Sequence, residues 1–418
     1  MKYKHLMILT VAATITASGV VISPTLVKAH GAADDETATQ PVNSAAFRKF
    51  IDNTRARALK KGVSAQLYNR AMAGLKPDPD VLKRAAHQPE FSTPIWKYIE
   101  KRVSATRIAT GKKMKSRYAT TVAAIEQRYG VDRHILLAIW GMESNYGSFK
   151  GKKSVVRSLA TLGYKGRRAK FGRQQLLAAL QILQRGDVPL SQFTGSWAGA
   201  MGHTQFIPTT YNAYAVDWTG DGKRDIWNSI SDSLASTANY LKKSKWRPTR
   251  PWGWEVTLPK NFNYRNVGTA ASRTTLKWKN IGVVPANGER YGVADVVARL
   301  ILPAGAKGPA FLVTRNFRSI LAYNNSVSYA LAVGHLADRI RGGGNFRGKW
   351  PVKDIPLTSK ERKELQRLLT TRGYNTKGTN GRIGRNTLAA IRAYQLKVGM
   401  APDGYASARL LKRLRSGR

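Results

Sequence analysis

The chain has 418 residues, enough for two or three domains, and 42% of them are hydrophobic, so it can build real cores. It contains 70 Lys and Arg against 24 Asp and Glu, and the formal net charge of +46 favours an anionic partner such as nucleic acid, acidic lipid or a cell-wall polymer. It contains no Cys, which excludes disulfides, thiol catalysis and Cys-ligated metals.

The N-terminus predicts export. Lys2, Lys4 and His5 precede an apolar run over residues 6–26, and small or apolar residues follow at a cleavage site after Ala29. This pattern is typical of a cleaved secretory signal peptide over residues 1–29, followed by a flexible lead-in over 30–43. An uncleaved anchor is the alternative, although Thr and Ser interrupt the run. Cleavage removes three Lys and no acid, which leaves +43, and export argues against nucleic acid as the partner.

The next segment predicts helices. An apolar stripe indicates one helix over residues 45–73, a second from about 91 to 110 and a third over 115–129, which Gly130 ends.

A carboxylate follows at the end of an apolar helix. Asp132 is a plausible N-cap, and Glu143 lies three residues after Trp140, four after Ile139 and seven after Leu136. These spacings put Glu143 on the apolar face of the helix. Burial and the negative end of the helix dipole both raise the pKa of a carboxyl group, which suits a general acid. The alternative is a terminal helix Glu that merely reaches solvent.

Residues 150–186 contain ten Lys and Arg and no acid, across a loop and a helix around residues 174–184. They predict either a solvated basic face or a surface that tracks an anionic chain.

A Gly-rich stretch over residues 195–211 makes a poor core strand. Gly199 and Gly202 would let backbone approach a ligand, and Gln205 offers a donor and an acceptor suited to a sugar. A simple connecting loop is the alternative.

Residues 217–228 resemble a calcium loop. Asp217, Asp221 and Asp225 occupy positions 1, 5 and 9, and Gly222 occupies position 6. Position 12 is Asn228 where a bidentate carboxylate is expected. An ordered metal-free turn and weak calcium or sodium binding both remain open.

The rest of the chain predicts a β-rich segment followed by further helices. A helix capped at 231 or 232 runs through 243, and short strands at 252–258, 276–278, 293–297 and 310–313 indicate a small β-rich insertion. Residues 323–326 lead into a helix over 327–340. A linker over 341–356 then precedes a separate unit of three short helices over 357–418, in which Thr358 and Glu361 have capping-box spacing.

Few catalysts are available. The six His form no His-x-x-x-His pair, and neither a Gly-x-Ser-x-Gly elbow nor a phosphate-binding Gly-Lys-Ser/Thr loop occurs. The remaining carboxylate acid points to glycoside chemistry. Between Glu143 and Asp217 the only acid is Asp187, which favours a mechanism with one carboxylate.

Three motifs in order carry a resemblance to a known family. They occupy residues 140–147, 195–208 and 323–331, with the calcium-like loop between the second and the third. Over residues 44–340 the chain resembles the lytic murein transglycosylases of the membrane-bound lytic transglycosylase B type. Residues 357–414 are similar to the three-helix peptidoglycan-binding domain of bacterial wall enzymes. The resemblance implies an α+β, mainly α fold, with a lysozyme-like helical catalytic domain.

The resemblance also implies site residues and chemistry. Glu143 would act as acid and then as base on peptidoglycan, forming 1,6-anhydromuramoyl ends, while a lysozyme-like muramidase and a catalytically silent wall-binding protein remain as alternatives. No cofactor would be required. Because no lipidation Cys is present, a soluble periplasmic form is expected. It is expected to be a monomer, and its charge favours contact with anionic wall or membrane surfaces. The cleft residues that the resemblance suggests are Ser196, Gln205, Tyr98, Tyr240, Tyr323, Asn324 and Tyr329.

Overall fold

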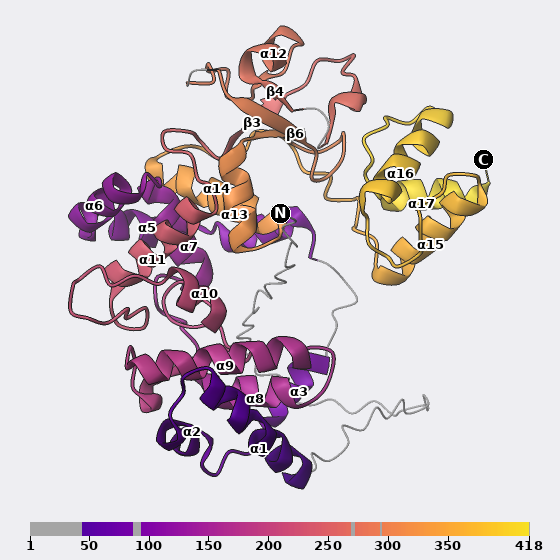
Figure 1. The fold of residues 1–418 in the computed structure, drawn as a ribbon. Helices are drawn as coiled ribbons and strands as arrows, with labels where there is room; N and C mark the ends of the chain where they lie inside the picture. Colours follow the sequence, from indigo (N-terminus) through magenta and orange to yellow (C-terminus); the bar gives the residue numbers. More distant parts are fainter. Residues whose placement is uncertain (1–43, 87–92, 269–271, 293–294, 418) are drawn as a thin grey trace, which may run out of the picture. The chain divides into compact units, whose positions relative to one another are not determined.

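The computed structural model describes residues 44–86, 93–268, 272–292 and 295–417. The predicted signal peptide and lead-in lie outside the described residues. The described chain divides into two compact units, one with residues 44–86 and 150–213 and one with residues 93–149 and 214–417 (Figure 1). None of the described helices is long and apolar enough to cross a membrane.

The first unit is built from helices and one short ladder. It contains α1 Ser44–Lys60, α2 Ala65–Met72, α3 Pro79–Ala86, α8 Val155–Tyr164, α9 Ala169–Arg185, the 3₁₀ turn η1 Leu190–Gln192, α10 Pro208–Tyr214, and the antiparallel strands β1 Lys153–Ser154 and β2 Thr194–Gly195. The single helix predicted over 45–73 is wrong. Gly62 has φ +81°, and the side chain of Ser64 then caps α2 by accepting from the Leu67 N–H.

Helices α8 and α9 pack closely because of two glycines. A Cβ at Gly172 would lie 2.3 Å from the backbone nitrogen of Gly163. The predicted helix around 174–184 is confirmed as part of α9. The basic residues of this region lie on the surface of a unit that is itself well packed, with Leu176, Leu180 and Ile182 fully buried.

The second unit contains a helical group: α4 Ile95–Arg102, α5 Ala105–Arg117, α6 Ala119–Tyr129, α7 Arg133–Ser144, α11 Ile230–Lys243, α13 Arg315–Tyr323 and α14 Val327–Arg341. The predicted end of a helix near 110 is wrong, because a new helix starts after Ser104, which caps α5. The predicted start of the next helix at 115 is also wrong, since α5 continues to Arg117 and α6 starts after Tyr118. Gly130 ends α6 in the left-handed conformation as predicted. Helix α13 was not predicted.

A five-stranded antiparallel sheet lies between α11 and α13 in the chain, with its strands in the order β4-β6-β7-β3-β5. Its elements are β3 Gly253–Thr257, the 3₁₀ turn η2 Tyr264–Asn266, β4 Ser272–Thr274, α12 Thr275–Asn280, β5 Val284–Pro285, β6 Val297–Ile301 and β7 Ala310–Val313. The predicted strands at 252–258 and 310–313 are confirmed. Of the strand predicted at 293–297, residues 293–294 lie outside the described residues, and β6 begins at Val297.

The predicted strand at 276–278 is wrong, because these residues belong to α12. The sequence Leu276-Lys277-Trp278 alternates apolar and polar residues as a strand does over three positions. In the structure Leu276 is exposed and Trp278 is fully buried, so the two do not share a face as they would in a strand. Thr274 caps this helix, and Asp295 accepts from the Leu276 N–H at 2.8 Å.

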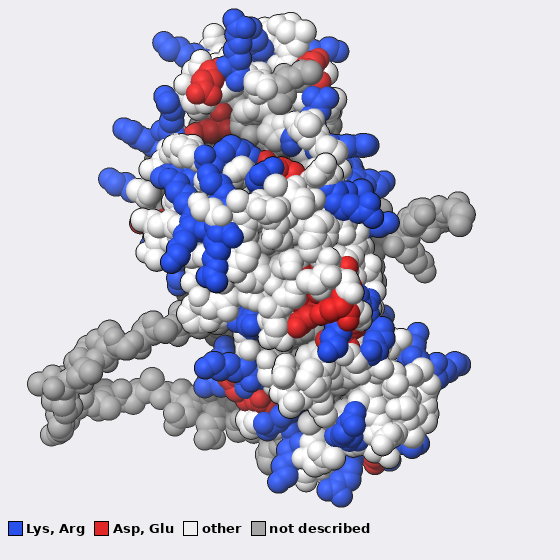
Figure 2. Space-filling view, turned by 90° about the vertical axis from the view of Figure 1, so that its left-hand side faces the viewer, with Lys and Arg blue, Asp and Glu red and all other residues white. Residues whose placement is uncertain are grey.

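Three helices form the end of the chain: α15 Ser359–Thr371, α16 Arg385–Lys397 and α17 Ala408–Ser416. The capping box of Thr358 and Glu361 is confirmed. Leu365, Leu369 and Ile391 pack in a core of their own. The predicted class, mainly α with a small sheet and a C-terminal three-helix unit, is therefore confirmed. In Figure 2, Lys and Arg side chains cover much more of the face in view than Asp and Glu do, as expected from the excess of basic residues in the sequence.

Candidate active site

Helix α7 ends at Ser144, one residue after Glu143. Asp132 caps its start by accepting from the His134 N–H at 2.7 Å. Asn145 and Tyr146 then have φ +50° and +58°, so two consecutive non-glycine residues are left-handed. This conformation is costly for L-residues. Glu143 therefore lies in the last turn of a helix whose end is fixed by a strained bend.

Tyr146 occupies space that two glycines leave open. Its ring packs edge-on against Trp140 with centroids 5.5 Å apart, and its hydroxyl donates to the backbone oxygen of Arg107 at 3.0 Å. A Cβ at Gly141 would lie 2.6 Å from the phenol carbon of Tyr146, and one at Gly111 would lie 2.4 Å from its hydroxyl. The bend after Glu143 is thus packed tightly on the back of α7.

The carboxylate of Glu143 is half-buried and has one hydrogen-bond donor close by. The Tyr329 hydroxyl, from the first turn of α14, donates to its Oε1 at 2.6 Å. Burial raises the pKa of Glu143 to about 7, while the Tyr329 hydrogen bond and the charge of Arg102 lower it in part. Near neutral pH this group can therefore both give up and accept a proton.

Several predicted tyrosines gather around this pair. Burial and the charge of Glu143 raise the pKa of Tyr329 well above its usual range, and Tyr323 and Tyr98 contribute electrostatically, so Tyr329 is a neutral donor. Arg102 lies over the Tyr98 ring, 5.7 Å from its centroid. The structure thus brings Tyr98, Tyr323 and Tyr329 together with Glu143.

Tyr240 joins the group through its ring. It packs edge-on against Tyr323 with centroids 5.1 Å apart, and its hydroxyl donates to the backbone oxygen of Ala322 at 2.5 Å. Asn324 is buried directly after α13. The tyrosines Tyr98, Tyr240, Tyr323 and Tyr329 form one aromatic wall within the second unit, with Asn324 next to Tyr323.

Ser196 and Gln205 belong to the other unit and have local roles there. The Ser196 hydroxyl accepts from the Ala200 N–H at 3.0 Å and so closes the turn. Gln205 has φ +51°, and its Nε2 donates to the backbone oxygens of Lys150 and Gly202 at 3.0 and 2.9 Å. The amide is therefore held in one orientation, with its donor side already used.

Glycine at position 199 has a structural reason of its own, beside the predicted approach of a ligand. A Cβ at Gly199 would lie 2.5 Å from a methyl carbon of Leu159, and its φ is +81°. Core packing and backbone conformation therefore both require glycine here. Gly202 also has a positive φ, of +69°.

The calcium-like loop does not offer a metal donor set. Asp217 uses one oxygen to accept from Gly220 N at 2.7 Å and the other to accept from Gly222 N at 2.8 Å. Asp225 accepts from Trp227 N at 2.8 Å. No cluster of three or more His, Asp or Glu that could hold a metal ion occurs among the described residues. Metal binding by Asp217, Asp221 and Asp225 thus gains no support from these contacts and stays a prediction.

A buried carboxylate organises this loop from within. Asp232, in the first turn of α11, is fully buried and accepts from the backbone N–H groups of Trp218, Thr219 and Asp225. The helix cap itself is Ser229, two residues before the predicted start.

Two residues beside Glu143 were not predicted from the sequence. Arg102 supplies the positive charge that acts on its pKa, and Tyr146 fixes the bend behind it. The spacing of Tyr98 and Arg102, four residues apart on a helix, could have indicated the first. Nothing local could have paired Tyr146 with Gly111.

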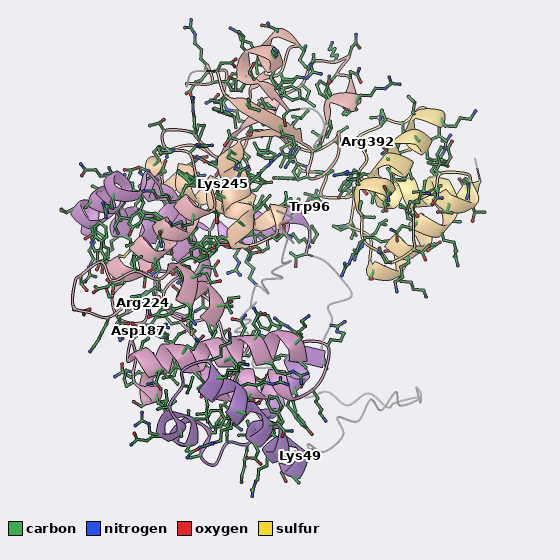
Figure 3. All side chains as sticks on the ribbon, in the orientation of Figure 1. Lys49, Trp96, Asp187, Arg224, Lys245 and Arg392 are labelled. Carbon is green, nitrogen blue, oxygen red and sulfur yellow. The ribbon has the colours of Figure 1, made fainter. Side chains whose placement is uncertain are left out.

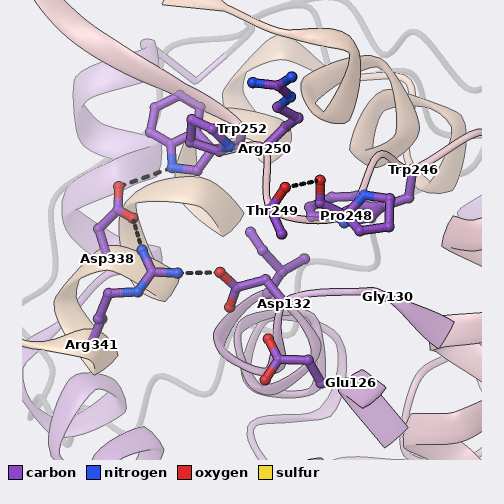
Figure 4. Close-up of a pocket in the computed structure, with 12 residues that line it drawn as sticks. Glu126, Gly130, Asp132, Trp246, Pro248, Thr249, Arg250, Trp252, Asp338 and Arg341 are labelled. Atoms are coloured by element: carbon purple, nitrogen blue, oxygen red, sulfur yellow. Dashed lines mark hydrogen bonds and ion pairs between the residues drawn. The ribbon is translucent and has the colours of Figure 1, made fainter. Parts of the chain in front are cut away.

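A pocket of about 410 Å³ lies at the other ends of α7 and α14 (Figure 4). Arg341 forms ion pairs there with Asp132 and, at 3.2 Å, with Asp338, which also accepts from Trp252 Nε1 at 2.9 Å. Burial raises the pKa of Asp338 to about 6. The two helices that carry Glu143 and Tyr329 are therefore tied together at both ends.

Comparison with known families gives two matches. Residues 46–338 match the model described as "Transglycosylase SLT domain", and residues 358–414 match the model described as "Putative peptidoglycan binding domain".

Individual relatives agree with these matches. The chain is 30% identical over 248 residues to membrane-bound lytic murein transglycosylase B of Escherichia coli strain K12; the match covers 58% of this chain and 66% of that protein, just under two thirds of its length. It is 52% identical to SltB3 of Pseudomonas aeruginosa, solved in complex with NAG-anhNAM-pentapeptide, with a TM-score of 0.85 over 88% of this chain and 99% of the other. Escherichia coli Slt35, solved in complex with calcium, is 26% identical with a TM-score of 0.59, over 72% and 93% of the two chains.

Proposed function

The chain belongs to the transglycosylase SLT domain family, and from this membership and the geometry around Glu143 we propose that it is a lytic transglycosylase that cleaves peptidoglycan without hydrolysis. The observation that carries the proposal is a half-buried carboxyl group with a pKa of about 7 that accepts a hydrogen bond from Tyr329. The bond cleaved is the β-1,4 link between N-acetylmuramic acid and N-acetylglucosamine.

In the first step Glu143 acts as a general acid. It gives its proton to the glycosidic oxygen as the bond from this oxygen to the anomeric carbon breaks. Burial keeps Glu143 protonated up to about pH 7. The hydrogen bond from Tyr329 stabilises the carboxylate that results, and the acetamido group of the substrate stabilises positive charge at the anomeric carbon.

In the second step the same carboxylate acts as a base. It takes the proton of the muramoyl 6-hydroxyl, whose oxygen bonds to the anomeric carbon and closes a 1,6-anhydro ring. No water is consumed, and Glu143 ends the cycle protonated. Arg102 is the charged side chain that lowers the pKa of Glu143, and no second carboxylate contributes to that shift within the described chain. This favours one residue in both roles.

The remaining predicted residues would bind the sugar chain. Tyr98, Tyr240, Tyr323 and Tyr329 would offer aromatic rings suited to sugars, and Asn324 would add an amide. The hydroxyls of Tyr240 and Tyr329 are already hydrogen-bonded, to Ala322 and to Glu143. Ser196 and Gln205 would also contact the sugar chain, Gln205 through its Oε1, because its Nε2 is already hydrogen-bonded.

The partition of the chain follows from the same proposal. A signal peptide over 1–29 exports the protein to the periplasm, residues 30–43 are a lead-in, residues 44–340 are catalytic, 341–356 connect, and 357–418 hold peptidoglycan. The enzyme acts as a monomer on glycan strands, needs no metal, and its charge favours contact with anionic wall or membrane surfaces.

The test compares the wild type with Glu143→Gln on purified sacculi. Wild-type products should carry anhydro ends, which weigh one water less than reducing ends in mass spectra, and Glu143→Gln should bind sacculi without turnover. Reducing ends would instead identify a lysozyme-like muramidase. Equal absence of turnover in both proteins would identify a silent wall-binding protein.

A further inference from the structure

A pocket of about 520 Å³ lies where the C-terminal helical unit meets the sheet region of the same compact unit. Its lining comes from three segments: residues 304–307 before β7, residues 350–354 before α15, and residues 395–409 around the start of α17. This volume is within the range of small-ligand sites. The residues described above around Glu143 do not line it.

The walls of the pocket are held by a network centred on Asp403. Its Oδ2 accepts from the Ala306 N–H at 2.7 Å, and its Oδ1 accepts from Gln395 Nε2 at 2.7 Å and from the Tyr405 N–H at 2.8 Å. A Cβ at Gly305 would lie 2.8 Å from Asp403 Oδ2, so glycine permits this contact. The junction between the two regions is therefore built by specific hydrogen bonds, and the pocket is preformed.

The aromatic side of this second pocket is also held in place by packing. Trp350 lines the pocket and stacks on Phe311 with centroids 6.3 Å apart. It also packs against Trp96 of α4, labelled in Figure 3, at 6.4 Å. Val352 beside it is 63% exposed. The pocket thus combines the packed Trp350 ring with the exposed apolar side chain of Val352.

Charge decides what this pocket accepts. Lys307, Lys353 and Arg409 line it with exposed side chains. Its two carboxylates are engaged within the protein, Asp403 as above and Asp354 by accepting from the Ala408 N–H at 3.2 Å. Burial raises the pKa of Asp354, and the charges of Arg409 and Lys307 lower it in part. The three cations exceed the two carboxylates of the lining by one positive charge, next to an apolar wall.

We propose that this pocket is a second substrate site, which binds the peptide stem of peptidoglycan through a free carboxylate. Such a stem offers what the pocket complements: carboxylates for Lys307, Lys353 and Arg409, and short aliphatic side chains for Trp350 and Val352. The proposal rests on the proposed function, because it places the peptide of the same polymer whose glycan Glu143 cleaves.

The experiment measures binding with the full chain carrying Glu143→Gln, so that no turnover interferes. Isothermal titration uses a synthetic pentapeptide stem with free carboxyl groups, the same peptide fully amidated, and the disaccharide without peptide. We expect the free-acid peptide to bind and the amidated peptide to bind at least about fivefold more weakly. Lys307→Glu with Lys353→Glu should weaken the free-acid peptide by about as much and leave the disaccharide unchanged.

The matched control is Lys360→Glu, which reverses an exposed charge on α15 of the same C-terminal unit, outside the pocket lining. It should leave all three affinities unchanged. Equal binding of the acid and amidated peptides, no binding of either, or equal weakening by Lys360→Glu would each overturn the proposal. Wild-type turnover of sacculi is measured separately, so a failure of the enzymatic proposal remains distinguishable.

Discussion

The hydroxyl of Tyr329 lies 2.6 Å from Oε1 of Glu143, although 186 residues separate the two in the chain. The contact joins the last turn of α7 to the first turn of α14, and the ion pair of Asp132 with Arg341 joins the opposite ends of these helices. The position of the carboxylate therefore depends on how two helices from distant parts of the sequence pack.

Replacing Tyr329 with Phe should shift the pH profile of turnover. The hydrogen bond stabilises the ionised carboxylate, so its loss raises the pKa of Glu143 further. The limb on which activity falls as Glu143 ionises should move to higher pH, and kcat should drop about tenfold. Tyr240→Phe is the control, since that hydroxyl contacts Ala322 instead. A profile that moves equally in both variants would contradict the assignment.

Arg102→Gln should also move the high-pH limb of the activity profile, on which Glu143 ionises, to higher pH. Removing the guanidinium takes away a positive charge that favours ionised Glu143. Lys101→Gln, at the exposed neighbouring position, should leave the limb in place. Initial rates on sacculi between pH 5 and 9 measure both variants, and a limb that Arg102→Gln leaves unmoved speaks against the electrostatic role.

The free energy of unfolding should depend on pH because the pKa of Glu143 is raised in the folded state. Because the folded-state pKa is about 7 and the unfolded value 4.5, the folded state binds the proton more tightly, and stability is lost as pH rises through this window. Glu143→Gln removes the loss, which is about 3 kcal/mol at most. The variant should thus gain in Tm over the wild type between pH 5 and pH 8, and a constant difference across this range would refute the expectation.

Gly141→Ala should destabilise the protein through overpacking. The added methyl would lie 2.6 Å from the Tyr146 ring and its hydroxyl, which the strained bend holds in place. We expect a loss of about 1–3 kcal/mol in urea unfolding, with reduced turnover. Gly344→Ala is the matched control, because its Cβ meets nothing within 4 Å and its φ is not positive; its stability should stay within about 0.5 kcal/mol of the wild type.

The loop over residues 217–228 should be stable without metal. A chelator should leave Tm unchanged, whereas Asp232→Asn should cost about 1–3 kcal/mol, because an amide turns a donor toward backbone N–H groups. Asp221→Asn, at an exposed position, should cost much less. A fall in Tm on chelation that calcium restores would show that the loop binds the ion after all.

Local sequence patterns predicted much of the fold. The Thr358–Glu361 capping box, the end of α6 at Gly130 and the strands β3 and β7 are confirmed, because caps, glycines and alternation act over a few residues. Predictions failed where the local signal was ambiguous. The segment 276–278 alternates like a strand over three residues, and the breaks after Lys60 and Arg102 depend on one or two capping residues inside long helical patterns.

The sequence by itself determined the position of Glu143 on the apolar face of its helix, and the scarcity of other acids nearby, because both follow from residue identity and helical period. Only the tertiary structure decided that Tyr329 and Arg102 act on this carboxylate, that Tyr146 fixes the bend behind it, and that Asp232 organises the loop expected to hold calcium. These contacts join segments far apart in the chain, so their partners depend on how helices pack and on which carboxylate becomes buried, and no local pattern carries that information.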